Sequence, residues 1–136
     1  MNIEIISCLN DNYSYLIHDE ISNTVAIVDP SEFMPCDTII SKNYQKLDFI
    51  LNTHHHYDHV GGNEELKKKY NSKVLGFEND KNRIPQIDTV LKDNQEFKIG
   101  TLNFTTIFIP GHTRGHVAFY FKKERVSAFS FLFPIS

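Results

Sequence analysis

The sequence has 136 residues, of which 40% are hydrophobic and 23% charged, values that are ordinary for one globular domain with its own core. The formal net charge is −3 with acids and bases interspersed, so the chain lacks the basic face of a nucleic-acid-binding protein and the polybasic patch of a membrane-surface protein. No apolar run approaches the roughly 18 residues that span a bilayer. We predict a single domain over residues 1–136, with neither nucleic acid nor a membrane as partner.

The start of the chain is typical of a strand and not of a signal peptide. "MNIEIISCLN" carries an acid early and no basic region before an apolar core. The two cysteines, Cys8 and Cys36, form no CxxC pair and no disulfide framework. We therefore predict a reduced, cytoplasmic protein.

Apolar runs that alternate or are rich in β-branched residues predict strands through most of the chain. Turn residues such as Asp29–Pro30 and Gly100 separate the runs. The predicted strands cover 2–7, about 12–17, 24–30, 47–53, 72–77, the two arms of a hairpin at 96–110, 116–121 and an apolar tail at 125–136. Two helices are predicted. The one at 36–45 has a weak pattern, and the one at 63–71 has Asn63 as its cap, acids first and lysines last. The mixture indicates an α/β sandwich.

The run "THHHYDHVGG" at 53–62 holds four of the seven histidines and directly follows a predicted buried strand. In extended backbone, residues i and i+2 point to the same side, so His54 and His56 can converge on one ion. His55 points to the other side. Imidazole and carboxylate ligands without thiolate suit zinc, iron or manganese. A histidine-rich loop can also be merely solvated, but its place at a strand end favours a metal site.

Three further side chains extend this predicted site. Asp58 and His59 follow as the chain turns and can face a second position nearby. His112, in "PGHTRGH", leaves the end of another predicted strand just as His54 does, and supplies the third ligand that a catalytic zinc needs besides water. A structural role for His112 is the alternative. For His116 we favour packing or support of a ligand.

These residues resemble those of the metallo-β-lactamase fold and, more narrowly, those of glyoxalase II, the hydroxyacylglutathione hydrolases. The family's THxHxDH motif is present as "THHHYDH", followed by "GGNEEL". "DNYSYLI", "AIVDP" and "PGHTRGH" are similar to the same subfamily, so the resemblance runs from about residue 3 to 121. It implies an αββα sandwich and the hydrolysis of glutathione thioesters, with S-D-lactoylglutathione giving D-lactate and glutathione.

The resemblance also implies roles for particular residues. Those matching His54, His56 and His112 hold one metal, and those matching Asp58 and His59 hold the second. Asp58 is our predicted catalytic residue, and Asp29 is expected to support the histidine loop from behind. Zn²⁺ is the expected metal, with iron or manganese as alternatives.

The sequence departs from the family after the last motif. The family carries a metal-bridging aspartate in a Gly-Asp-Thr turn, whereas this chain reads "RVSAFSFLFPIS" there and has no aspartate after Asp93. The family's later histidine and its helical glutathione-binding segment would lie beyond Ser136. We therefore expect a sandwich truncated to about its first half, supplying essentially only the first sheet, with one tightly bound metal rather than two.

Three hypotheses follow from the motifs and the departure. The first is a hydroxyacylglutathione hydrolase-like enzyme whose activity truncation impairs. The second is an inactive remnant that binds one metal, and the third is a mononuclear-iron persulfide dioxygenase of the same fold. An uncovered sheet face, with Phe129, Phe131 and Phe133, is expected to favour self-association.

Overall fold

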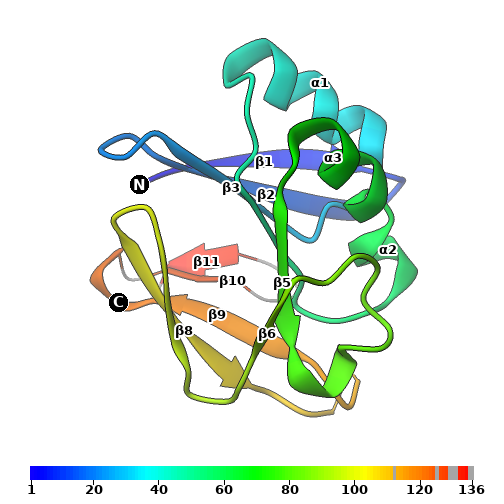
Figure 1. Cartoon of the computed structure of the whole chain (residues 1–136), viewed down its shortest axis with the longest axis vertical. Coiled ribbons are helices and arrows are strands. Elements are labelled where there is room, and N and C mark those ends of the chain that lie inside the picture. The colour runs from blue at the N-terminus through cyan, green and yellow to red at the C-terminus, as the bar shows by residue number, and fades with distance from the viewer. Residues whose placement is uncertain (112, 125, 129–131, 135–136) are drawn as a thin grey trace.

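Two β-sheets pack face to face in this chain, with helices on the outer side of the first sheet (Figure 1). The computed structural model describes residues 1–111, 113–124, 126–128 and 132–134. Predicted positions His112, Phe129 and Phe131 lie outside the described residues, and the side chain of Phe133 is not described either. Among the helices of the described residues, none is long and apolar enough to cross a membrane.

The first sheet has six strands in the order β1-β2-β3-β4-β5-β6. The β1–β2 and β2–β3 pairs are antiparallel, whereas β3–β4, β4–β5 and β5–β6 are parallel. The parallel strands are short, and β3, β4 and β5 are almost fully buried, as expected for strands covered on both faces. Their bounds are β1 Asn2–Cys8, β2 Asn12–Asp19, β3 Thr24–Val28, β4 Phe49–Leu51, β5 Lys73–Phe77 and β6 Thr89–Leu91.

Helices α1 (Phe33–Asn43) and α3 (Asn63–Tyr70) cover the outer face of this sheet. Buried side chains spaced four residues apart on α1, Cys36 and Ile40, join Leu66 of α3 and the outward side chains of the sheet in one core cluster. The remaining helical elements are the four-residue α2 (Tyr57–Val60) and two 3₁₀ turns, η1 (Glu78–Asp80) and η2 (Lys122–Glu124).

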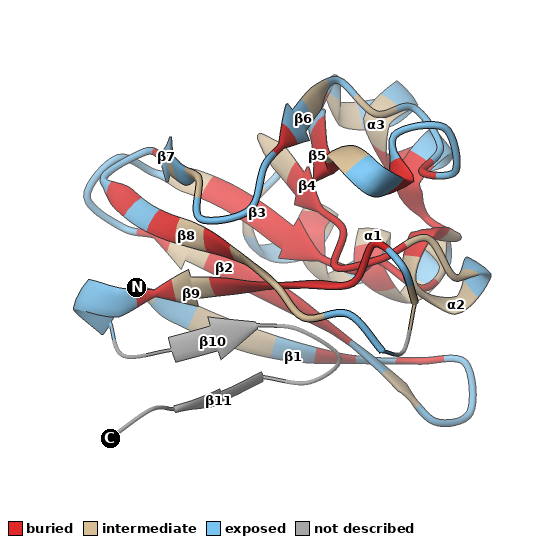
Figure 2. Ribbon diagram, turned by 90° about the horizontal axis from the view of Figure 1, so that it is seen from below, coloured by how far each residue is buried: buried red, intermediate tan, exposed pale blue. Residues whose placement is uncertain are grey.

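The second sheet has the strand order β11-β10-β9-β8-β7 and is antiparallel throughout. Alternate residues of β8 and β9, such as Phe104 and Phe119, fill a second core cluster with Tyr15, Leu51 and Leu75 of the first sheet. Buried stretches run along β8 and β9 in Figure 2. The bounds are β7 Glu96–Ile99, β8 Leu102–Phe108, β9 Val117–Phe121, β10 Val126–Ala128 and β11 Leu132–Pro134.

Two sequence-based expectations are wrong. The chain does not supply only the first sheet, because the hairpin and the strand after it build a second sheet whose aromatic inner face requires the first as partner. Asn63 is not a helix cap. The cap position of α3 is Gly62, and the buried Asn63 amide pairs with Asn52 instead. The face of the first sheet that the sequence predicts to be uncovered is instead packed against the second sheet. Self-association through an uncovered sheet face stays a prediction. No helix of the described residues covers the outer face of the second sheet.

A buried carboxylate joins the two sheets at one end. Asp19, at the end of β2, accepts hydrogen bonds from the backbone N–H and the hydroxyl of Thr101, both at 2.7 Å, and from the Ser22 hydroxyl. Gly100 (φ 60°) lies so close that a Cβ there would be 2.7 Å from the Asp19 carboxylate. Burial alone would raise the pKa of Asp19, but the hydrogen bonds from Ser22 and Thr101 outweigh it and hold the pKa well below its ordinary value.

Asp19→Asn is expected to lower the free energy of unfolding at pH 7 by about 1–3 kcal/mol, because the amide replaces an ionised acceptor with one that can meet fewer donors. The folded-state pKa is depressed, so the stabilisation is present above the unfolded value near 3.8 and is lost as the pH falls below it. Urea unfolding between pH 7 and pH 3 should therefore show a smaller loss of stability for the variant than for the parent. Equal losses in the two proteins would contradict this role of Asp19.

Candidate metal centre

The carboxyl ends of three parallel strands meet at one edge of the first sheet and create the candidate site. Asp29 follows β3, His54 comes three residues after β4, and Asp80 comes three residues after β5. Segments far apart in the sequence therefore place polar side chains at a common edge, where ligands bind in sheets of this kind. Both Asp29 and His54 are buried.

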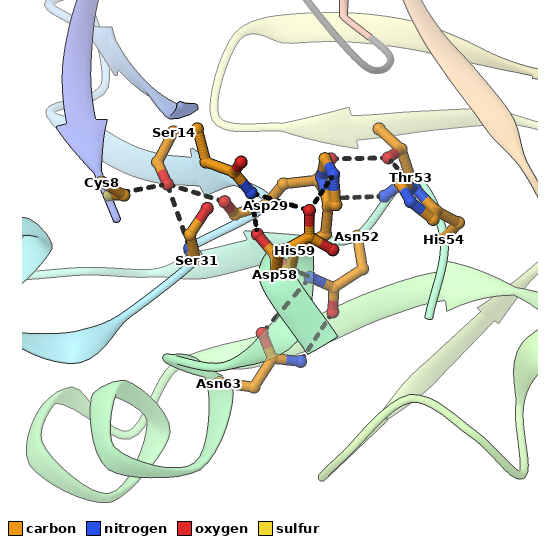
Figure 3. Close-up of polar contacts among 11 residues, drawn as sticks. Cys8, Ser14, Asp29, Ser31, Asn52, Thr53, His54, Asp58, His59 and Asn63 are labelled. Atoms are coloured by element: carbon orange, nitrogen blue, oxygen red, sulfur yellow. Dashed lines mark hydrogen bonds and ion pairs between the residues drawn. The ribbon is translucent and has the colours of Figure 1, made fainter. Parts of the chain in front are cut away.

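Asp29 is the centre of the hydrogen-bond network at this edge (Figure 3). Its carboxylate accepts the Thr53 backbone N–H at 2.7 Å, the Thr53 hydroxyl at 2.5 Å and the His59 Nδ1–H at 2.9 Å. Its backbone has a φ of 51°, a left-handed conformation that aspartate tolerates better than most residues, and its N–H bonds to Leu51 O. Both carboxylate oxygens are in use, so Asp29 supports the histidine loop, as the resemblance implies.

Three imidazoles surround the ring of His54. The ring centroid of His59 lies at 4.1 Å, that of His116 at 4.6 Å and that of His56 at 4.8 Å. Ligand-type atoms of Asp29, His54 and His59 all fall within 4.8 Å of one another. So many imidazoles in one place repel each other when protonated, whereas neutral imidazoles are the ligands that zinc prefers. The donor set therefore fits a divalent metal ion.

The network also fixes which ring nitrogen of two histidines carries the proton. The Thr53 hydroxyl gives its only proton to Asp29, so its contact of 2.8 Å with His54 Nδ1 requires that Nδ1–H donates. The Nδ1–H of His59 donates to Asp29 in the same way. In both neutral rings Nε2 then carries the lone pair, which is the form in which imidazole binds a metal.

Asp58 lies at the rim of the site. Its carboxylate accepts the Asn12 amide at 2.9 Å and lies 3.6 Å from His59 Nε2, and its side chain is 46% exposed. Burial would raise the pKa of Asp58, but the Asn12 hydrogen bond and the nearby His59 outweigh it and lower the pKa. Burial would likewise lower the pKa of His59, but the hydrogen bond to Asp29 and the charges of Asp29 and Asp58 raise it. The carboxylate of Asp58 is thus kept ionised beside His59.

The structure brings four of the five predicted ligands into one loop and leaves the fifth undescribed. His54, His56, Asp58 and His59 lie in or beside α2, while His112 lies outside the described residues. The first residue of β9 borders the site, because the Val117 N–H donates to Thr53 O at 2.9 Å.

Sequence reasoning missed several residues that hold this loop. Asn12 bonds both the carboxylate and the backbone carbonyl of Asp58, and Asn52 bonds His59 O. The buried Asp80 accepts His55 Nδ1–H at 3.1 Å and pairs with Arg83, and a Cβ on Gly115 would lie 2.4 Å from it. His55 is therefore directed to Asp80, away from the Asp29 network. Of these residues that hold the loop, Asn12 alone has a signal in the sequence, because it lies within the motif "DNYSYLI".

The fold, together with the histidine cluster at the edge of the first sheet, identifies the class of protein. Residues 10–127 match the family model of the metallo-beta-lactamase superfamily, and the chain belongs to that superfamily. Solved structures agree on the fold. The BLEG-1 B3 metallo-beta-lactamase gives a TM-score of 0.79 at 22% identity over 93% of this chain and 70% of its own, and BJP-1 of Bradyrhizobium japonicum gives 0.78 at 23% over 99% and 60%. The predicted metallo-β-lactamase-like fold is confirmed.

Relatives in sequence are more specific. The hydroxyacylglutathione hydrolase of Pelagibacter ubique is 49% identical over 124 residues, which are 91% of this chain and 52% of the relative. That of Methylococcus capsulatus is 45% identical over 119 residues, 88% of this chain and 46% of the relative. The resemblance to hydroxyacylglutathione hydrolases is confirmed. The chain spans about half the length of the curated relatives that it matches.

Proposed function

We propose that this chain is a metal-dependent hydrolase of glutathione thioesters, with S-D-lactoylglutathione as substrate and D-lactate and glutathione as products. The observation that carries the proposal is the network in which Asp29 and Thr53 orient His54 and His59 at the edge of the first sheet. The names and identities of the relatives support the substrate class.

In this proposal His54, His56 and His112 hold one metal ion, and Asp58 and His59 lie beside a second position. Zn²⁺ suits these imidazole and carboxylate donors, and iron and manganese are alternatives. When bound, such an ion supplies Lewis-acid chemistry, polarising a carbonyl and lowering the pKa of water. One tightly held ion is expected, since two protein ligands alone bind the second position weakly.

The side chains of the chain itself contribute orientation and charge. Asp29 and Thr53 hold the rings of His54 and His59 so that each Nε2 is presented as an acceptor. Asn12 holds Asp58 at the rim, where the ionised carboxylate can accept a proton from water or orient it. Burial of His54 and Thr53 keeps bulk water from the base of the site, which strengthens these interactions.

The test is whether the purified chain hydrolyses S-D-lactoylglutathione when zinc, iron or manganese is supplied. The loss of thioester absorbance measures the reaction. We expect metal-dependent turnover that His54→Ala reduces by at least about 100-fold, because a missing ligand removes the ion. His18→Ala is the matched control, because His18 bonds Asn23 on the surface. Metal binding without turnover would favour the inactive remnant, and no turnover with any of the three metals would overturn the proposal.

A further inference from the structure

Two cysteines that are distant in the sequence meet in the core cluster between the first sheet and α1. Cys8 ends β1 and Cys36 lies in α1, yet their sulfur atoms are 3.8 Å apart. Both are free thiols, with 2% and 0% of their surface exposed. The sequence alone gave no sign of this pairing, because 28 residues separate them. A disulfide bond has a length of about 2.05 Å, so a shift of less than about 2 Å would join the two sulfurs.

We propose that Cys8 and Cys36 form a reversible intramolecular disulfide, making this pair an oxidation site of the protein. The proposal does not depend on hydrolase activity. Buried thiols are usually inert, but here the two thiols contact each other, so oxidation of one is followed by capture by the other. Cys8 is also near the surface, because it immediately precedes the exposed turn residues Leu9 to Asp11, on an edge strand.

The two thiols are not equivalent. Cys8 ends an edge strand beside an exposed turn and contacts the Ser14 hydroxyl, whereas Cys36 lies inside α1 with none of its surface exposed. We therefore assign Cys8 as the thiol that meets the oxidant and Cys36 as the resolving thiol. The contact with Cys36 lowers the pKa of Cys8, which agrees with this assignment.

The oxidant is a hydroperoxide, and the reaction balances in two steps. Cys8 sulfur attacks one peroxide oxygen, the O–O bond breaks, and the leaving oxygen departs as an alcohol or water with the proton lost by Cys8. Cys36 sulfur then attacks the Cys8 sulfenic acid, the S–S bond forms, the S–O bond breaks, and the hydroxyl leaves as water with the proton of Cys36. The two thiols give up two electrons, and the peroxide accepts them.

Ser14 connects this pair to the candidate metal centre (Figure 3). Its hydroxyl lies 3.4 Å from Cys8 Sγ, donates to Asp29 O at 2.7 Å and accepts the Ser31 N–H at 3.1 Å. Closing the disulfide removes the thiol protons and moves Cys8 relative to Ser14. The backbone of Asp29 is therefore in the same hydrogen-bond network as the thiol pair. The carboxylate of the same residue holds Thr53 and His59.

The experiment oxidises the reduced, purified chain with hydrogen peroxide and counts thiols after unfolding, together with the intact mass. We expect both thiols to disappear together, the mass to fall by two hydrogen atoms, the chain to stay uncrosslinked on a non-reducing gel, and dithiothreitol to restore both thiols. Persistence of both thiols at a peroxide concentration that oxidises free cysteine would overturn the proposal. So would a gain of oxygen without a disulfide, or a disulfide between two chains.

Two single variants test the assigned roles. In Cys36→Ala, dimedone should trap one sulfenic acid on Cys8, because the resolving thiol is gone. In Cys8→Ala, Cys36 should react at least 10-fold more slowly than Cys8 does in the parent. Alanine suits both buried positions, and circular dichroism checks folding. The result on the unsubstituted chain decides the proposal even where a variant does not fold.

Discussion

Asp29→Ala is expected to lower the free energy of unfolding by about 3 kcal/mol or more and to abolish tight zinc binding. The substitution leaves the buried Thr53 N–H and hydroxyl without their acceptor and releases His59. It also places alanine at a φ of 51°, which adds about 1 kcal/mol. Urea unfolding of the metal-free chain and a zinc titration measure the two effects separately.

Asp29→Asn is the matched variant for this position. Asparagine accepts the left-handed backbone, so it removes the charge and one acceptor without the conformational penalty. We expect it to retain more stability than the alanine variant while still weakening zinc binding. Whichever way its amide is turned, the NH₂ group faces at least one of the donors that the Asp29 carboxylate accepts from Thr53 and His59. An alanine variant that unfolds within about 0.5 kcal/mol of the parent and binds zinc equally would contradict the central role of Asp29.

Gly61→Ala is expected to destabilise the chain by about 3 kcal/mol. A Cβ at Gly61 would lie 2.3 Å from the Ser31 carbonyl oxygen and 3.2 Å from that of Tyr57, and backbone atoms cannot yield as a flexible side chain can. The histidine loop would have to move away from the segment after β3, so zinc binding should weaken as well. Thermal unfolding and zinc titration provide the measurements.

Tyr57→Ala serves as the control for this glycine, because Tyr57 belongs to the same loop and is 79% exposed. Its stability should stay within about 0.5 kcal/mol of the parent. Equal melting temperatures for Gly61→Ala and the parent would show that the loop can move freely against the Ser31 backbone, contrary to the packing described above.

Most strands could be predicted from the sequence, because each is an apolar run ended by a turn residue. β6 could not, since Thr89–Leu91 is too short to show a period, and α2 is a single turn of helix. The second sheet was misjudged for another reason. The sequence predicts its strands correctly, but the departure from the family after the last motif wrongly suggests the loss of a whole layer.

The candidate site, like the fold, could be predicted from the sequence only in part. Four of its predicted ligands lie within one loop, where residue type and spacing are visible in the sequence. The groups that hold this loop come from other elements: Asn12 of β2 is 46 residues from Asp58, and Asp80 of η1 is 25 residues from His55. Such contacts depend on the order of the strands in the sheet, which cannot be predicted from a local sequence pattern. Asp29 was expected only because the family resemblance implied it.

Both backbone polar groups of Thr53 are hydrogen-bonded. Its N–H donates to the Asp29 carboxylate, and its C=O accepts from the N–H of Val117. These partners belong to different sheets, so the histidine loop gains both supports only when strands β3, β4 and β9 are in place. During synthesis on a ribosome, the loop itself would emerge long before Val117. The ion-binding geometry would therefore arise only after β9 has been synthesised and has docked, and the nascent chain would carry its histidines until then without it.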